Sequence, residues 1–256
     1  MSIFDSHCHL YWNADDNSIE SQIEAAENAG VSRFVCVGTN ADTSMKSLNI
    51  AKQYSQVVAS VGIHPNDVPD IAELSNDLQQ ISDLAKQHAW HAIGETGLDF
   101  FHKRGEPLAQ EQSFLHHLDL AKELSLPVII HCREAATELV TLLEKRNEPV
   151  CGVMHCFSEG PEFVQRLLDI GLHFSFAGNI TYPKSDLIRE SASLIPADKL
   201  LIETDAPFLA PQPMRGKKNQ SAYIVHTLDV VASSRNVTAN DIRRQIFDNS
   251  IKLFNL

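Results

Sequence analysis

Short apolar runs, rich in valine and isoleucine, alternate with segments of helical periodicity from one end of the chain to the other. This alternation is typical of parallel strand–helix–strand units. The pattern predicts eight strands, at Ile3–Asp5, Arg33–Gly38, Val57–Gly62, Ala92–Gly94, Pro127–Ile130, Gly152–Met154, His173–Ala177 and Leu200–Glu203.

Helical periodicity fills the connections between these strands. Gly30 and Gly171 end two of the helices, because glycine readily adopts the left-handed conformation of a helix C-terminus. The predicted helices span Ile19–Ala29, Glu111–Leu124, Glu134–Lys145, Glu162–Ile170 and, with less clear bounds, Ile71–Gln87 and Lys184–Ser193. Two more helices, Ala222–Ser234 and Ala239–Phe254, follow the eighth strand.

Polar residues decide between the two α/β folds that this pattern allows, a closed (β/α)8 TIM barrel with an additional C-terminal helix and a doubly wound open sheet. Histidines and carboxylates follow the first, third, fourth, fifth, sixth and eighth predicted strands. A barrel brings the C-terminal ends of all its strands to one rim, whereas an open sheet separates the first strand from the eighth. We therefore predict the barrel, as a single domain over residues 1–256.

His7 and His9 follow the first predicted strand. Side chains alternate along a strand, so both imidazoles project to one face and Cys8 to the other, and the histidine pair can chelate one ion. Cys8, Cys132 and Cys156 each follow a candidate ligand histidine. We expect all three thiols to pack between the barrel and its helices.

Six candidate ligands converge on the predicted rim, namely His7, His9, Glu95, His131, His155 and Asp205. That number exceeds the four ligands of a tetrahedral ion and suits two divalent metal cations about 3.5–4 Å apart. Mixed histidine and carboxylate ligands accept Zn²⁺, Mn²⁺, Ni²⁺ or Mg²⁺.

The chemistry of each ligand suggests its role. Glu95 would bridge the two metals, because a carboxylate offers two oxygens and a negative charge between the cations. The other ligands would divide into His7, His9 and Asp205 on the first metal, and His131 and His155 on the second. A hydroxide held by the metals would be the nucleophile, with Asp205 as its general base.

The motifs that contain these residues resemble those of the TatD-type deoxyribonucleases of the amidohydrolase superfamily. They are Asp5–Leu10, Gly62–Pro65, Gly94–Asp99, His131–Arg133, His155–Phe157 and Glu203–Pro207, in the family's order. The resemblance implies a barrel with two metals and a phosphodiesterase that acts on DNA. It also implies that His64 and Arg133 face the substrate and that Glu203 lies beside the site.

The formal net charge of −12 argues against a protein that coats nucleic acid by bulk electrostatics. Cations nevertheless gather in two loops of the predicted rim, at Lys103, Arg104, Arg215, Lys217 and Lys218. Aromatic residues on the same side that could stack on a base, although a single aromatic residue more often belongs to the core, are Phe100, Phe101, Phe157 and Tyr182. The remaining histidines lack this context, and we expect surface or packing roles for most of them, namely His88, His91, His102, His116, His117, His173 and His226.

No apolar stretch is long enough for a membrane span, and the N-terminus lacks a secretory signal. Five cysteines, an odd number without a Cys-x-x-Cys pair, favour reduced thiols and a cytoplasmic location. We predict a metal-dependent, exonuclease-like deoxyribonuclease that acts on DNA ends or another phosphodiester, with no obligate protein partner. Two alternatives remain: hydrolysis of an acyl ester such as D-aminoacyl-tRNA at the same site, and a metal-binding barrel without turnover.

Overall fold

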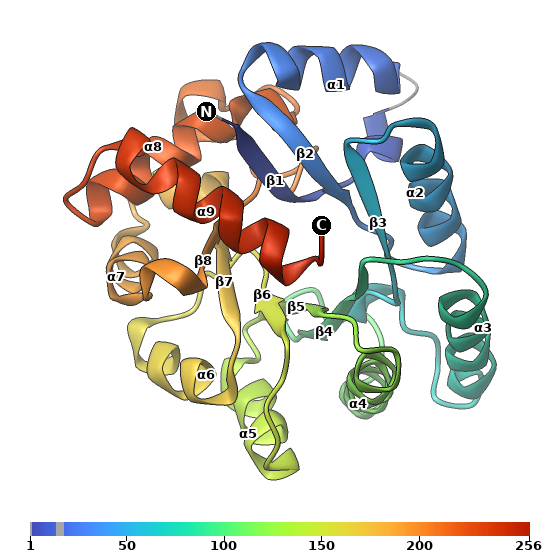
Figure 1. Ribbon diagram of the computed structural model, residues 1–256. Helices are drawn as coiled ribbons and strands as arrows, with labels where there is room; N and C mark the ends of the chain where they lie inside the picture. The colour runs from blue at the N-terminus through green and yellow to red at the C-terminus, as the bar shows by residue number, and fades with distance from the viewer. Residues whose placement is uncertain (1, 14–17) are drawn as a thin grey trace.

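The chain folds around eight parallel strands in a computed structural model that describes residues 2–13 and 18–256. The strands follow one another in chain order around the ring at the centre of Figure 1. Their bounds are β1 (Ile3–Cys8), β2 (Val31–Cys36), β3 (Val57–Val61), β4 (Ala92–Asp99), β5 (Val128–Arg133), β6 (Gly152–Met154), β7 (His173–Phe176) and β8 (Leu200–Ile202).

The residues after β8 close the ring against β1. The backbone N–H of His9 donates to Ala206 O at 2.8 Å, and that of Asp205 donates to His7 O at 2.9 Å. Cys8 and Ala206 form a parallel bridge between these two segments. The predicted barrel is therefore confirmed, and the open sheet is excluded.

Nine helices of the described residues surround the barrel or cover one of its ends. They are α1 (Ile19–Asn28), α2 (Ala41–Gln53), α3 (Leu74–Gln87), α4 (Pro107–Leu124), α5 (Ala136–Arg146), α6 (Val164–Ile170), α7 (Asp186–Leu194), α8 (Ile224–Ser234) and α9 (Ala239–Leu253). Helix α2, for which the sequence pattern provided no bounds, begins at a capping box between Asn40 and Thr43. The other helices lie where periodicity predicts them, within a few residues.

Three strands run further than predicted. β1 continues to Cys8, β4 to Asp99 and β5 to Arg133, so His7, Glu95 and His131 lie within strands and not after them. The pairing of β4 with β5 shifts register between Ile93 and Thr96 and then resumes. Gly94 and Gly97 interrupt the apolar pattern in this part of β4, so the sequence does not indicate the second half of the strand.

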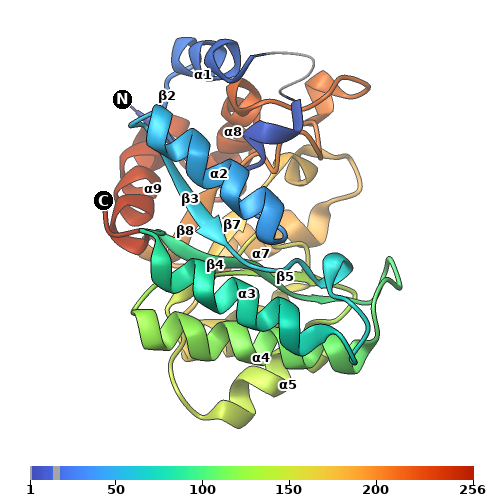
Figure 2. The same cartoon turned by 90° about the vertical axis from the view of Figure 1, so that its right-hand side faces the viewer.

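Helix α9 closes the end of the barrel that holds the N-terminal ends of the strands (Figures 1 and 2). Phe254, directly after α9, is fully buried and stacks on Phe4 of β1 with ring centroids 5.9 Å apart. The barrel interior is an apolar cluster with residues from seven strands, Phe4, Val35, Val58, Ala92, Ile129, Val153 and Leu201. The interior is thus packed, and the opposite end of the strands is left for polar chemistry.

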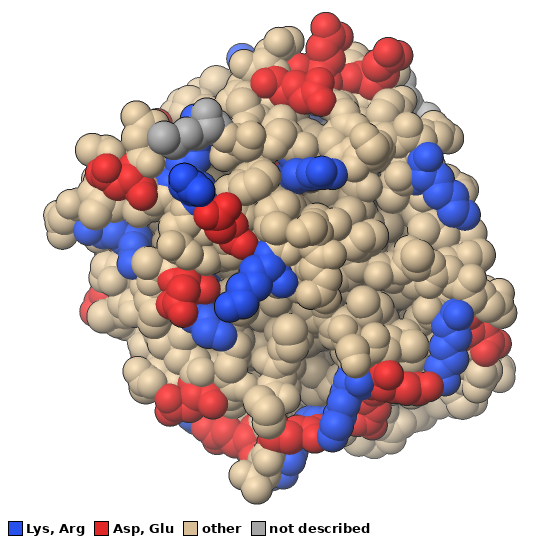
Figure 3. Space-filling model, in the orientation of Figure 1, with Lys and Arg blue, Asp and Glu red and all other residues tan. Residues whose placement is uncertain are grey.

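The face around α9 carries cationic and acidic side chains intermixed, with acidic side chains gathered over α1 (Figure 3). This end of the barrel therefore offers no extended cationic surface to a polyanion. Among the described helices, none combines the length and apolar character that crossing a bilayer requires.

Candidate metal centre

Glu95 reaches the barrel mouth from a part of β4 that only glycine allows. Gly94 and Gly97 have φ angles of +133° and +142°. A Cβ at Gly97 would lie 2.0 Å from His131 O, and one at Gly94 would lie 2.6 Å from Ile129 O. The two glycines let β4 press against β5 and hold Glu95 between them, 2% exposed.

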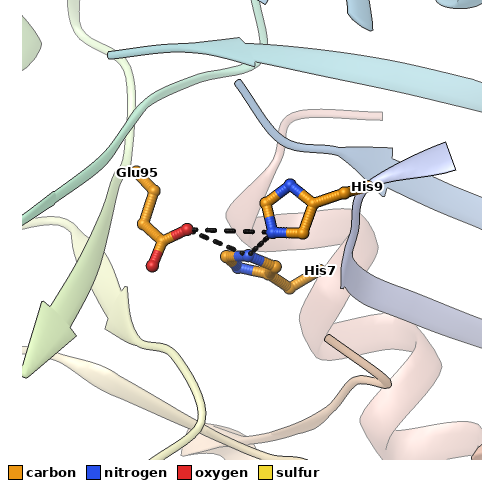
Figure 4. Close-up of side chains that lie close together, drawn as sticks. All are labelled: His7, His9 and Glu95. Carbon is orange, nitrogen blue, oxygen red and sulfur yellow. Dashed lines mark hydrogen bonds and ion pairs between the residues drawn. The ribbon is translucent and has the colours of Figure 1, made fainter. Parts of the chain in front are cut away.

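One oxygen of Glu95 faces the histidine pair of β1. Oε2 lies 3.3 Å from His7 Nε2 and 4.0 Å from His9 Nε2 (Figure 4). Asp205, after β8, places Oδ1 at 3.5 Å from His9 Nε2 and 3.7 Å from His7 Nε2. The structure thus brings together the residues that the sequence assigned to a first metal.

The other oxygen of Glu95 faces a second histidine group. Oε1 lies 2.8 Å from His155 Nε2, 2.9 Å from His131 Nδ1 and 3.3 Å from His64 Nε2. The six predicted ligands therefore meet at one site, where the two oxygens of Glu95 face separate histidine groups and Asp205 lies beside the first. This is the arrangement that a bridging carboxylate requires.

The nitrogen atoms of this site fit divalent cations. His7 Nε2 and His9 Nε2 lie 3.3 Å apart, and His131 Nδ1 and His155 Nε2 lie 3.2 Å apart. An imidazole nitrogen binds a cation through its lone pair, so each of these close pairs can supply two ligands once the facing nitrogens have lost their protons. Donor atoms within 4.8 Å of one another group as His7, His9 and Glu95, and again as His64, Glu95 and His131.

The second nitrogen of three of these histidines is held by an oxygen. His9 Nδ1 lies 2.9 Å from Val37 O, His131 Nε2 lies 3.1 Å from Asp99 Oδ2, and His155 Nδ1 lies 3.1 Å from Glu203 Oε1. Each oxygen accepts an N–H, which turns the lone pair of the opposite nitrogen toward the site. His7 differs, because its Nδ1 is buried without a hydrogen-bond partner in the part of the chain that the structure describes.

Asp99 is a site residue that the sequence reasoning missed. It is fully buried, and besides His131 it accepts hydrogen bonds from His102 Nδ1 at 2.8 Å and Asn66 Nδ2 at 3.0 Å. The signal was present in the alternation of Glu95, Gly97 and Asp99 along one strand, but the predicted strand stopped at Gly94. His102 lies on the surface, as expected, and is in addition a partner of this carboxylate.

Burial disfavours the charged form of each carboxylate here, and the histidines reverse that effect. Burial acts to raise the pKa of Glu95, but the nearby His155, His64 and His7 hold it well below its usual range. The pKa of Asp205 is likewise lowered, against burial, by the hydrogen bond with His9 and the charges of the other histidines. Both carboxylates are therefore ionised near neutral pH, as cation ligands must be.

His64 lies in the site with one nitrogen already occupied. Its Nδ1 accepts the backbone N–H of Asn66 at 3.0 Å, so in the neutral ring the proton is on Nε2, which faces Glu95. Burial lowers the pKa of His64 and favours this neutral form. The ring therefore presents an N–H donor, which is compatible with the substrate-facing role predicted for it.

Two arginines of the rim, one at the end of β5 and one in the loop after β8, lie over aromatic rings. The guanidinium carbon of Arg133 lies 4.1 Å from the Phe101 ring centroid, and that of Arg215 lies 4.4 Å from the Tyr182 ring centroid. Phe100 packs against the core. Exposed side chains complete the two loops, at Lys103, Arg104, Lys217 and Lys218.

Two predictions after β6 are wrong. Phe157 is 2% exposed and packs edge-on against Phe174, with centroids 5.0 Å apart, so it does not offer a surface to a base. Cys156 is only half-buried, and its Sγ accepts from Asn179 Nδ2 at 3.6 Å. The cause is the left-handed φ of +45° at Cys156, which ends the alternation of faces there. Cys8 and Cys132 are buried, as predicted.

Comparison with known proteins agrees with this geometry. A family model described as TatD related DNase matches residues 4–255. The chain is 35% identical to YabD, an uncharacterized metal-dependent hydrolase of Bacillus subtilis strain 168, over 99% of both chains. It is 32% identical to YcfH, an uncharacterized metal-dependent hydrolase of Escherichia coli K12, over 100% of this chain and 97% of that one.

Among solved structures, YjjV, a TatD homologue from Escherichia coli K12, superposes with a TM-score of 0.89 at 29% identity. The match covers 99% of this chain and 98% of that one. Family model, relatives and fold therefore agree, and the chain belongs to the TatD family of metal-dependent hydrolases.

Proposed function

We propose that this hydrolase is a deoxyribonuclease that cleaves phosphodiester bonds at DNA ends. The observation that carries the proposal is the carboxylate of Glu95 between two histidine groups, beside an N–H donor on His64. The description of the matching family as DNase-related supports DNA as the substrate.

The proposed ligand roles follow the two groups. His7, His9 and Asp205 would hold one divalent cation, and His131 and His155 would hold a second. Glu95 would contribute to both. Such cations polarise a phosphoryl oxygen and lower the pKa of a water molecule that attacks phosphorus.

Asp205 is the carboxylate of the site that water can reach. Its side chain is 14% exposed, against 3% for Glu95 and 0% for Asp99 and Glu203. We therefore assign to Asp205 the acceptance of a proton from the attacking water. Asp99 and Glu203 are committed to His131 and His155 and serve as positioning residues.

Two groups would orient the phosphodiester. His64 presents its N–H toward the site, where it can donate to a phosphoryl oxygen. Arg133, exposed and held over Phe101, offers a guanidinium that suits the two oxygens of a phosphate. Both contacts would strengthen as negative charge develops on the phosphoryl oxygens.

The test uses single- and double-stranded DNA labelled at either end, incubated with purified protein and each of Zn²⁺, Mn²⁺, Ni²⁺ and Mg²⁺. We expect release of nucleotides from an end, and its loss in Asp205→Asn prepared in parallel, which controls for contaminating nucleases. A D-aminoacyl-tRNA is assayed beside the DNA. Release of the amino acid without nucleotides would move the chemistry to an acyl ester. Release of neither, with cations bound, would leave a metal-binding barrel without turnover.

A further inference from the structure

We infer that Trp12 and Phe208 form a stacking platform for the nucleobase next to the phosphate that is cleaved. The inference rests on the proposed function, because it assigns a further part of the same DNA substrate to a surface outside the predicted site. We call these two side chains the aromatic ledge.

The ledge is anchored to two candidate ligands. Trp12, in a 3-10 turn after β1 (Leu10–Asn13), donates its backbone N–H to His9 O at 2.9 Å. Phe208 donates its backbone N–H to Asp205 O at 2.8 Å. Each aromatic residue thus stands three positions after a ligand, at opposite sides of the junction where β1 meets the chain after β8.

The two rings meet each other and His9. Trp12 and Phe208 contact edge to face, with centroids 5.1 Å apart and an interplanar angle of 80°. The His9 ring lies 5.7 Å from Trp12 and 6.1 Å from Phe208. Because His9 Nε2 belongs to the first ligand group, the ledge borders the place where the phosphate would bind.

The ledge is exposed although it is apolar. Trp12 is 50% exposed and Phe208 43%. Single exposed apolar side chains are common and need no explanation, but two exposed aromatic rings in mutual contact beside a polar site form a surface suited to a ligand. Tyr11 stacks on Trp12 at 5.9 Å and donates its hydroxyl to Val37 O at 3.0 Å, which keeps the indole in place before any ligand arrives.

A nucleobase is the occupant that fits both the apolar ledge and its surroundings. Within a nucleotide one sugar separates the base from its phosphate, so a phosphate beside His9 brings a base within reach of the ledge. Arg133 and Arg215, held over other aromatic rings of the same rim, provide positive charge for the sugar–phosphate backbone. Stacking accepts every base because each has a π-face, so the ledge predicts little sequence preference.

The first experiment compares two oligodeoxynucleotides that differ only in whether the terminal nucleotide has a base or is abasic. Loss of stacking in Trp12→Ala should lower kcat/KM for the base-bearing end by about 5- to 150-fold. The loss on the abasic end should be at least fivefold smaller. Trp12→Phe, which retains a ring, should recover most of the activity, and Leu194→Ala, which trims an equally exposed apolar side chain on α7, serves as the control. Bound metal is measured for every variant.

The second experiment reads binding without turnover. The chain has two tryptophans, and Trp90 is buried, with its indole N–H donated to Leu84 O at 2.8 Å. In Trp90→Phe the fluorescence therefore reports Trp12 alone. The base-bearing oligonucleotide should quench this fluorescence, and the abasic one should not.

The outcomes separate the ledge from the proposed hydrolysis. Equal losses on both ends in Trp12→Ala, or equal quenching by both oligonucleotides, would overturn the inference while DNA cleavage stands. Base-dependent quenching without any cleavage would support the ledge and refute the nuclease. A change of oligomeric state in Trp12→Ala, measured by light scattering, with unchanged kinetics would assign the surface to a second copy of the chain and overturn the inference.

Discussion

Asp99 Oδ2 accepts a hydrogen bond from His131 Nε2 at 3.1 Å, and the same oxygen lies 2.8 Å from His102 Nδ1. A buried carboxylate thus connects a candidate metal ligand to a half-exposed histidine. The contact fixes which nitrogen of His131 has the proton and turns Nδ1 toward Glu95. Glu203, directly after β8, likewise accepts a hydrogen bond from His155, with Oε1 at 3.1 Å from Nδ1.

The first prediction tests these positioning residues. Asp99→Asn keeps the shape of the side chain but loses the charge that holds the His131 N–H. Affinity for divalent cations should fall by about 10- to 100-fold, the usual cost of losing such a contact, while the fold is retained. Titration calorimetry on the chelator-stripped protein measures this directly. Glu203→Gln is the matched variant for His155, and Asp42→Asn, a surface substitution on α2, is the control. Wild-type affinity in both site variants would show that these carboxylates only pack.

The second prediction concerns stability in acid. Helix α4 contains His117, a fully buried ring whose Nε2 accepts the backbone N–H of Ile63 at 3.1 Å and whose Nδ1 donates to Ser113 O at 2.7 Å. Burial lowers the pKa of His117 to about 4 from 6.5. Above pH 6.5 both folded and unfolded chains hold the neutral ring, so its contribution to stability is complete. As the pH falls from 6.5 toward 4 only the unfolded chain takes up the proton, which lowers the free energy of unfolding by about 3 kcal/mol.

His117→Gln removes this titration while keeping an amide donor and acceptor. Denaturant unfolding of both proteins between pH 7 and pH 4.5 should give curves of stability against pH that converge as the pH falls. Parallel curves would mean that His117 takes up its proton at the same pH in the folded chain as in the unfolded chain.

The third prediction concerns the basic loop after β8. Lys217→Ala should weaken DNA binding. The plot of log affinity against log salt should also become less steep, its negative slope smaller in magnitude by about 1, because one fewer counterion is released. Lys252→Ala removes the same charge from α9, at the opposite end of the barrel, and should leave the slope unchanged. Fluorescence anisotropy at four or more salt concentrations gives both slopes. Equal slopes for the two variants would place DNA elsewhere on the surface.

The barrel was predictable because its strands are apolar runs and because chemistry-bearing residues stand near their C-terminal ends. β6 has the predicted bounds, and the other five candidate ligands lie in one site with Glu95. Where the backbone departs from regular alternation, the sequence pattern does not indicate the strand. Gly94 and Gly97 conceal the second half of β4, and with it Asp99.

Side-chain direction after a strand was the least predictable feature. The left-handed φ at Cys156 buries Phe157, which position alone placed among the stacking aromatics. Trp12 was not among the predicted stacking residues because its environment depends on a distant part of the chain. Its proximity to Phe208 depends on the closure of β1 against the chain after β8, a contact between residues 196 positions apart that no local pattern contains.

The last prediction separates the two carboxylates at the centre of the site. Glu95→Gln removes the anionic group that both histidine groups face, so two cations would confront each other across a few ångströms. In surroundings of low dielectric that repulsion is strong, and at least one of about two bound ions per chain should be lost. Asp205→Asn still offers a carbonyl oxygen to a cation that His7 and His9 can hold, but an amide cannot accept a proton from water. Metal content should change little, while the single-turnover rate falls by about a hundredfold or more. Metal analysis and single-turnover kinetics at saturating cation, on both variants, give the comparison. The assignment fails if Glu95→Gln retains its full complement of ions while Asp205→Asn loses them.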